Sequence, residues 1–307
     1  MKVSRSTATA RTTAAPCNNS TFQLKIPVAP GEQVVLSELQ TFPNNNYLAA
    51  GTITLANGAK EGLLLVLSND GNILAQKRLR INNQPTIIAD ARISLTGDIY
   101  IAGLFADGTQ ATFMARFKDN LSATWIKTVN ETELPVKVTL DLFRLNFIAV
   151  AVQLANSIHY KAYDETGNPQ WNKKVTPTSL TGLVGFSTLM NGKLGLVTNC
   201  QFNGNPAVQV FDIDITTGVL ITTHIENNGP AESKAMATTG FNERLNILGV
   251  TKNTGGGYDG FRNNIYGSEK AKPYISTRYL WPFTWALLQR WIMQVMPWVI
   301  SCPPPDS

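Results

Sequence analysis

Apolar and polar residues alternate with a period of two over most of the chain. The clearest stretch is residues 97–129, where three alternating runs are separated by turn-rich pieces, and a fourth run lies just upstream. Alternation bounded by Gly, Asp and Asn is typical of antiparallel strands joined by hairpins. The sequence therefore predicts a four-stranded antiparallel unit, with strands at 86–94, 98–105, 111–118 and 122–129.

This unit recurs along the chain. Its second strand is found as YLAAG at 47–51, YIAG at 100–103, FIAV at 147–150, LGLV at 194–197 and NILG at 246–249. Repeats of roughly 50 residues with several strands each are typical of propeller blades. We therefore expect an all-β fold, a β-propeller of four-stranded antiparallel blades with four complete blades and a partial fifth.

The repeat pattern divides the chain into three parts. Residues 1–19 are rich in Ser, Thr and Ala with few large apolar side chains, so we expect a disordered segment. Residues 20–261 hold the propeller repeats. The alternation stops within the third strand of the fifth unit, and residues 262–307 are predicted to be a tail outside the propeller.

The tail contains four of the six tryptophans of the chain, Trp281, Trp285, Trp291 and Trp298. Arg290 and several Gln and Pro residues interrupt its apolar run, which argues against a membrane span. An amphipathic segment contacting a membrane or a partner fits the Trp and Arg content better. A truncated gene, or translation out of frame after residue 261, is the third interpretation, and the three stay open.

The basic charge of the chain lies in its ends. The net charge is +5, but residues 1–30 hold four Lys or Arg and no acid, and residues 262–307 hold five against two acids. The repeats in between hold 17 basic and 19 acidic residues. A nucleic-acid footprint should lie on the folded body, so no nucleic-acid partner is predicted.

Few residues are candidates for chemistry. Asp212 and Asp214 are two apart on a predicted strand and would face the same side, as a carboxylate pair or part of a calcium site, although solvated side chains are the simpler interpretation. The three cysteines and two histidines have no metal-ligand spacing, and Cys200 is expected to be buried. No catalytic residue, cofactor or metal is predicted.

Trp125 and Trp171 take the same place on the fourth strands of two units. Aromatic side chains at such positions either stack on sugars or fill the space between adjacent blades, and we expect packing. They are kept as weak candidates for ligand binding.

The Ala-Gly strand ends and the Trp-containing fourth strands, WIKTV and WNKKV, resemble those of bacterial secreted and cell-surface β-propeller repeat proteins over residues 32–261. The resemblance implies a part of a larger surface or secreted protein, here truncated in its fifth blade, with an extracellular location. We expect this part to be a non-enzymatic binding or scaffold module whose ligand is a protein or a carbohydrate. No apolar run follows the basic N-terminus, so no secretory signal is predicted. The alternative is a propeller enzyme acting on carbohydrate. An open ring would favour self-association.

Overall fold

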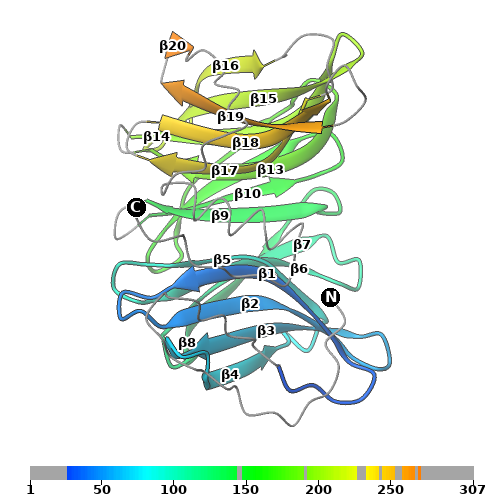
Figure 1. Cartoon of the computed structure of the whole chain (residues 1–307), viewed down its shortest axis with the longest axis vertical. Coiled ribbons are helices and arrows are strands. Elements are labelled where there is room, and N and C mark those ends of the chain that lie inside the picture. The colour runs from blue at the N-terminus through cyan, green and yellow to red at the C-terminus, as the bar shows by residue number, and fades with distance from the viewer. Residues whose placement is uncertain are drawn as a thin grey trace, which may run out of the picture. The chain divides into compact units, whose positions relative to one another are not determined.

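The computed structural model describes residues 26–270, except residues 144–146, 190–191, 227–232, 242–243, 253–257 and 267–268 (Figure 1). Every sheet in this part of the chain has four strands that are consecutive in sequence, and within each sheet consecutive strands pair antiparallel. The prediction of an all-β chain of repeated four-stranded antiparallel units is therefore confirmed. The sheets fall into two compact units that meet in sequence between Thr132 and Glu133, and each unit is described by itself.

The first unit contains two sheets. The first sheet consists of β1 (Gln33–Thr41), β2 (Tyr47–Thr54), β3 (Lys60–Leu67) and β4 (Ile73–Leu79). The second consists of β5 (Thr86–Ile93), β6 (Ile99–Phe105), β7 (Ala111–Phe117) and β8 (Ala123–Asn130). These four bounds agree to within one residue at each end with the strands that alternation predicts at 86–129.

The second unit contains three sheets. The third sheet consists of β9 (Lys137–Phe143), β10 (Phe147–Gln153), β11 (Ile158–Asp164) and β12 (Pro169–Val175). The fourth consists of β13 (Leu180–Thr188), β14 (Lys193–Phe202), β15 (Asn205–Asp214) and β16 (Leu220–Glu226). The fifth consists of β17 (Ser233–Phe241), β18 (Arg244–Lys252), β19 (Tyr258–Tyr266) and β20 (Glu269–Lys270).

The fifth sheet extends further than the sequence predicts. Main-chain pairing joins β19 to β18 from Lys252↔Tyr258 to Arg244↔Tyr266, and β20 adds a fourth strand. Strand pairing thus continues past residue 261, where the alternation of the sequence stops. The division of the chain into propeller and tail at that residue stays a prediction. The remaining residues of β19, RNNIY, are mostly polar and do not alternate, but pairing by main-chain groups does not require alternation.

Within each unit, sheets pack face to face. The inner strands β2, β3, β6 and β7 are buried on both faces, and the apolar side chains between the first two sheets include Leu64, Ile88 and Phe113. In the outer strands β4 and β8 exposed residues alternate with partly buried ones. This difference explains why the inner strands are the apolar repeats of the sequence and the outer ones the amphipathic repeats.

A bulge in the first strand explains the repeated Ala-Gly pair of the second strand, which continues for two or three residues beyond the glycine. The β1–β2 register shifts between Leu36 and Glu38, and the β5–β6 register shifts between Ile88 and Asp90. Gly51 and Gly103 lie opposite these bulges, and a Cβ atom at either would be 2.1 Å from a carbonyl oxygen of the first strand. Only glycine fits there.

Candidate functional site

The structure places Asp212 and Asp214 in different surroundings. Asp214 ends β15, and its Oδ1 accepts hydrogen bonds from the main-chain N–H groups of Thr216 and Thr217 at 3.0 and 2.8 Å. Asp212 is buried, with 3% of its surface exposed. The carboxylate of Asp214 thus stabilises the β15–β16 turn, whereas Asp212 belongs to the interior of its unit.

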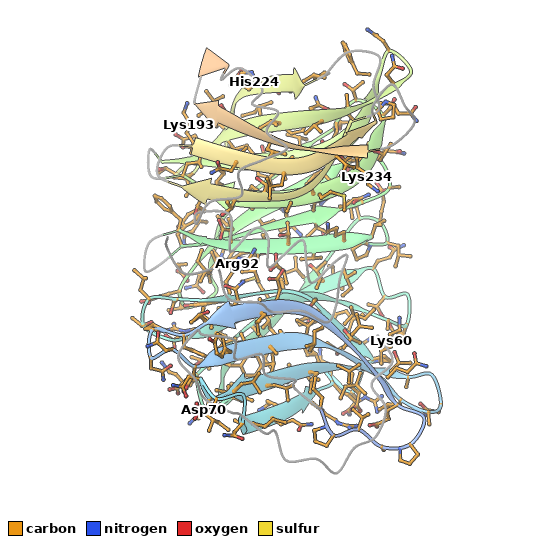
Figure 2. All side chains as sticks on the ribbon, in the orientation of Figure 1. Lys60, Asp70, Arg92, Lys193, His224 and Lys234 are labelled. Carbon is orange, nitrogen blue, oxygen red and sulfur yellow. The ribbon has the colours of Figure 1, made fainter. Side chains whose placement is uncertain are left out.

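Asp212 lies beside a histidine rather than a second acid. Its Oδ2 is 3.7 Å from Nε2 of His224, which projects from β16 (Figure 2), and both atoms are buried without a hydrogen-bond partner. Burial raises the pKa of the Asp212 carboxyl, although the charges of His224 and Lys193 act in the opposite direction. Because both facing atoms are closed to solvent, a substrate has no access to them.

Trp171 lies in the core between the third and fourth sheets. It is 8% exposed, its Nε1 donates a hydrogen bond to the carbonyl oxygen of Ile215 at 3.0 Å, and its ring contacts the rings of Phe147 and Tyr160. A partner for the indole N–H is what a buried Trp requires. The geometry of Trp171 is that of a packing residue, with no ring face left for a sugar.

Trp125 is only half-buried, on β8 of the second sheet. Its ring makes an edge contact with Tyr100, with 6.3 Å between ring centroids. The guanidinium of Arg116 lies 5.5 Å from the same Tyr100 ring. Trp281, Trp285, Trp291 and Trp298 lie outside the described residues, so membrane or partner contact through the tail stays a prediction.

A group of buried charges joins the first strands of the first two sheets, and sequence reasoning missed it. Arg92, labelled in Figure 2, donates to Asp90 at 2.5 Å and lies 3.5 Å from Glu38 of β1. Glu38 and Asp90 are 7% and 1% exposed. Such charges are stable in the interior only when paired, so this group braces β1 against β5. In the sequence this group could have been recognised from an acid and an arginine two positions apart, Asp-Ala-Arg, within an otherwise apolar strand.

The first unit also has a surface hollow of about 430 Å3. Its floor is apolar and its rim carries three amides and one carboxylate. The lining residues are Phe42, Val66, Leu74, Ala75, Asn44, Asn46, Asp119 and Asn120. Phe42 and Val66 are buried beneath the floor, whereas Leu74 is 57% exposed. The combination of an apolar base with a few polar groups around it is typical of ligand sites.

Two hairpin turns, distant in sequence, form the rim. In the β1–β2 turn the main-chain N–H of Asn46 donates to Oδ1 of Asn44 at 3.1 Å. In the β7–β8 turn the N–H of Ser122 donates to Oδ1 of Asn120 at 2.9 Å. Each amide oxygen is thereby used within its own turn. Among the described residues, the NH2 groups of Asn44 and Asn120 have no hydrogen-bond acceptor, so both remain available as donors.

A lysine of the first sheet holds the second turn in place. Nζ of Lys77, on β4, donates to the carbonyl oxygen of Leu121 at 3.0 Å and lies 5.5 Å from the ring centroid of Phe117. Leu121 itself is 4% exposed and has a φ angle of 62°. The buried side chain and the lysine together position Asp119 and Asn120 beside Leu74 and Ala75, so the rim is formed before any ligand arrives.

Within the described part of the chain, no group of three or more His, Cys, Asp or Glu residues is arranged to hold a metal ion. Cys200 is 1% exposed, as predicted, and burial raises the pKa of its thiol. No described helix is long and apolar enough to cross a membrane.

Comparison with known proteins identifies the fold alone. No family model and no curated protein matches the sequence. A protein of unknown function from Dyadobacter fermentans has a similar structure, with a TM-score of 0.50 and 11% identity over 80% of this chain and 79% of that chain. A lignostilbene dioxygenase from Pseudomonas brassicacearum gives a TM-score of 0.44 and 8% identity over 73% of this chain. This chain spans 59% of the length of that dioxygenase.

At such identities a shared arrangement of strands carries no site residues from one protein to another. The dioxygenase therefore assigns no reaction to this chain. The surface hollow of the first unit is the candidate site, because it alone among the features above combines solvent access with unused hydrogen-bonding groups.

Proposed function

We propose that the chain is a β-propeller of four complete blades and a partial fifth, and that it acts as a non-enzymatic binding module. The repeated four-stranded antiparallel sheets support a propeller-like scaffold, as does the likeness to the Dyadobacter protein. Propellers commonly serve as rigid supports for sites built on their loops and turns. The hollow between the β1–β2 and β7–β8 turns is such a site.

The ligand that the hollow fits best is a carbohydrate. The single observation on which this proposal depends is that unused amide donors and a carboxylate surround an apolar floor. The NH2 groups of Asn44 and Asn120 can donate to sugar hydroxyls, and the carboxylate of Asp119 can accept from them. Leu74 and Ala75 offer an apolar surface to the C–H face of a sugar ring. A neutral oligosaccharide uses both parts, whereas a flat apolar ligand would leave the rim unused.

We further propose that this module belongs to a larger protein of the cell surface or the extracellular medium. This follows from the resemblance of residues 32–261 to exported propeller repeat proteins and suits a carbohydrate ligand.

A carbohydrate-degrading enzyme is the alternative, and it has less support. Such enzymes need two carboxyl groups that both reach the substrate. Oδ2 of Asp212 is buried against His224, and the carboxylate of Asp214 is bonded to its own turn.

A glycan array tests the proposal. The full chain should bind a subset of printed neutral oligosaccharides, and the same sugars should be recovered intact after prolonged incubation. Shortened sugar products would favour the enzyme. Absence of binding across neutral glucose, mannose, galactose and N-acetylglucosamine oligomers would contradict the carbohydrate proposal.

A further inference from the structure

The fourth strand of each sheet, here called its outer strand, has an edge that could pair with another strand, and most of these edges are protected by their sequence. β4 carries Lys77 and Arg78, β8 carries Lys127, and β20 contains Lys270. β12 starts at Pro169 and carries two lysines, Lys173 and Lys174. Lysine, arginine and proline on an edge strand oppose the addition of another strand.

β16 is the exception among the described outer strands. Its sequence, LITTHIE, contains no Lys, Arg or Pro and is rich in β-branched residues. Val219, just before β16, and Leu220 and Ile221 at its start are 54%, 40% and 50% exposed. Within the described residues β16 pairs with β15 only and forms the outer end of its sheet (Figure 1). An exposed apolar strand with an unprotected edge is suited to pairing with another chain.

We propose that β16 pairs antiparallel with β16 of a second copy of this chain, so that two four-stranded sheets become one eight-stranded sheet across a two-fold axis. The charge pattern favours this occupant. With Thr222 at the axis, Glu226 lies opposite Gly218, and with Thr223 at the axis it lies opposite Leu220. Neither register places like charges opposite each other, and both place a threonine beside its own copy, which is a favourable cross-strand pair.

Pairing of β16 with the outer strand of a different sheet of the second copy is less favourable. Each of the other outer strands would place a lysine, an arginine or a proline along the shared edge. When β16 of one copy pairs with β16 of the other, the free β16 edge of each copy becomes hydrogen-bonded. The assembly therefore stops at two chains instead of growing into a fibre.

Light scattering coupled to size-exclusion chromatography tests this interface on the full chain over a range of concentrations. The wild-type chain should approach twice its mass of 33.5 kDa as the concentration rises. Ile221→Lys places a charge on the β16 edge and should keep the chain at the mass of one copy. Ile126→Lys, at a residue of β8 that is 44% exposed, is the matched control and should still dimerise.

Three outcomes would overturn the proposal. They are a wild-type chain that stays at one copy, a dimer that persists in Ile221→Lys, and growth beyond two copies. Thr223→Lys changes a second exposed residue of β16 and tests whether the effect belongs to the strand as a whole. It should give the same loss of dimer as Ile221→Lys. Circular dichroism should give the same β-sheet spectrum for all three variants.

Discussion

Gly103 lies directly against the main chain of Ile87. A Cβ atom added at Gly103 would be 2.1 Å from the carbonyl oxygen of Ile87 and 2.4 Å from the ring of Phe113. The ring could move, but the carbonyl oxygen belongs to the bulged strand β5, which also carries the buried Asp90. The close approach of Gly103 therefore ties the second strand of the unit to the bulge of the first.

Gly103→Ala should strongly destabilise the chain. The added methyl group must displace main chain, so we expect a loss of about 3 kcal/mol in the free energy of unfolding. Urea denaturation followed by circular dichroism measures it. Gly182→Ala is the matched control, because Gly182 also lies beside a bulge but has no atom within 4 Å of the position that an added methyl group would take. Equal stability of the two variants would contradict the explanation given for the Ala-Gly repeat.

The two repeated tryptophans should differ in their contribution to stability. Trp171→Ala removes a buried ring together with its hydrogen bond to Ile215, and should cost about 3–5 kcal/mol. Trp125→Ala removes a half-buried ring in edge contact with Tyr100 and should cost less than half as much. Thermal unfolding of the two variants side by side measures the difference. A larger loss in Trp125→Ala would contradict the packing described for Trp171.

Asp212 should make stability depend on pH in a direction opposite to that of most acids. Burial raises the pKa of its carboxyl above the unfolded-state value of about 3.9, so the folded chain holds this proton more tightly than the unfolded chain does. The ionised carboxyl therefore costs stability at pH values above its folded-state pKa. That cost shrinks as the pH falls through the folded-state pKa, and it is gone below the unfolded-state value of about 3.9.

Asp212→Asn should accordingly raise the melting temperature at about pH 7.5, and the gain should shrink on acidification. Asp214→Asn is the matched control. Hydrogen bonds from Thr217 lower the pKa of Asp214, so ionised Asp214 stabilises the fold above the unfolded-state pKa and this stability is lost as the pH falls through the lowered value. The control should thus be less stable than wild type at neutral pH. A lower melting temperature of Asp212→Asn than of wild type at neutral pH would contradict the explanation that burial of the ionised Asp212 carboxyl costs stability.

The strands could be predicted because their cause is local. Alternation and turn residues located the four strands of residues 86–130 to within one residue, and the same signals located the equivalent strands of other units. The end of β19 could not be predicted in this way. Its last residues are held by main-chain pairing with β18, and polar side chains in that stretch removed the alternation on which the prediction depended.

The candidate site could not be predicted from the sequence. Asn44 and Asn120 are 76 positions apart in number, and each looks like an ordinary turn residue. They line one hollow because Lys77 of the first sheet bonds to Leu121 of a turn in the second. Asp212 was identified as a candidate from its spacing to Asp214, but its neighbour in the fold is His224, on the next strand. Such sites are formed by contacts between strands and between sheets. The alternation of residues along one strand does not predict these contacts.

Isothermal titration calorimetry with an oligosaccharide selected by the array tests the central claim most directly. Asn120→Asp keeps the oxygen that accepts from Ser122 but removes the NH2 donor, as Asn44→Asp does in the other turn. Asn57→Asp makes the same change in the β2–β3 turn, where Oδ1 of Asn57 accepts from Ala59 outside the hollow. We predict a loss of about tenfold in affinity for each rim variant and wild-type affinity for Asn57→Asp. Unchanged binding in both rim variants, or an equal loss in Asn57→Asp, would contradict the account.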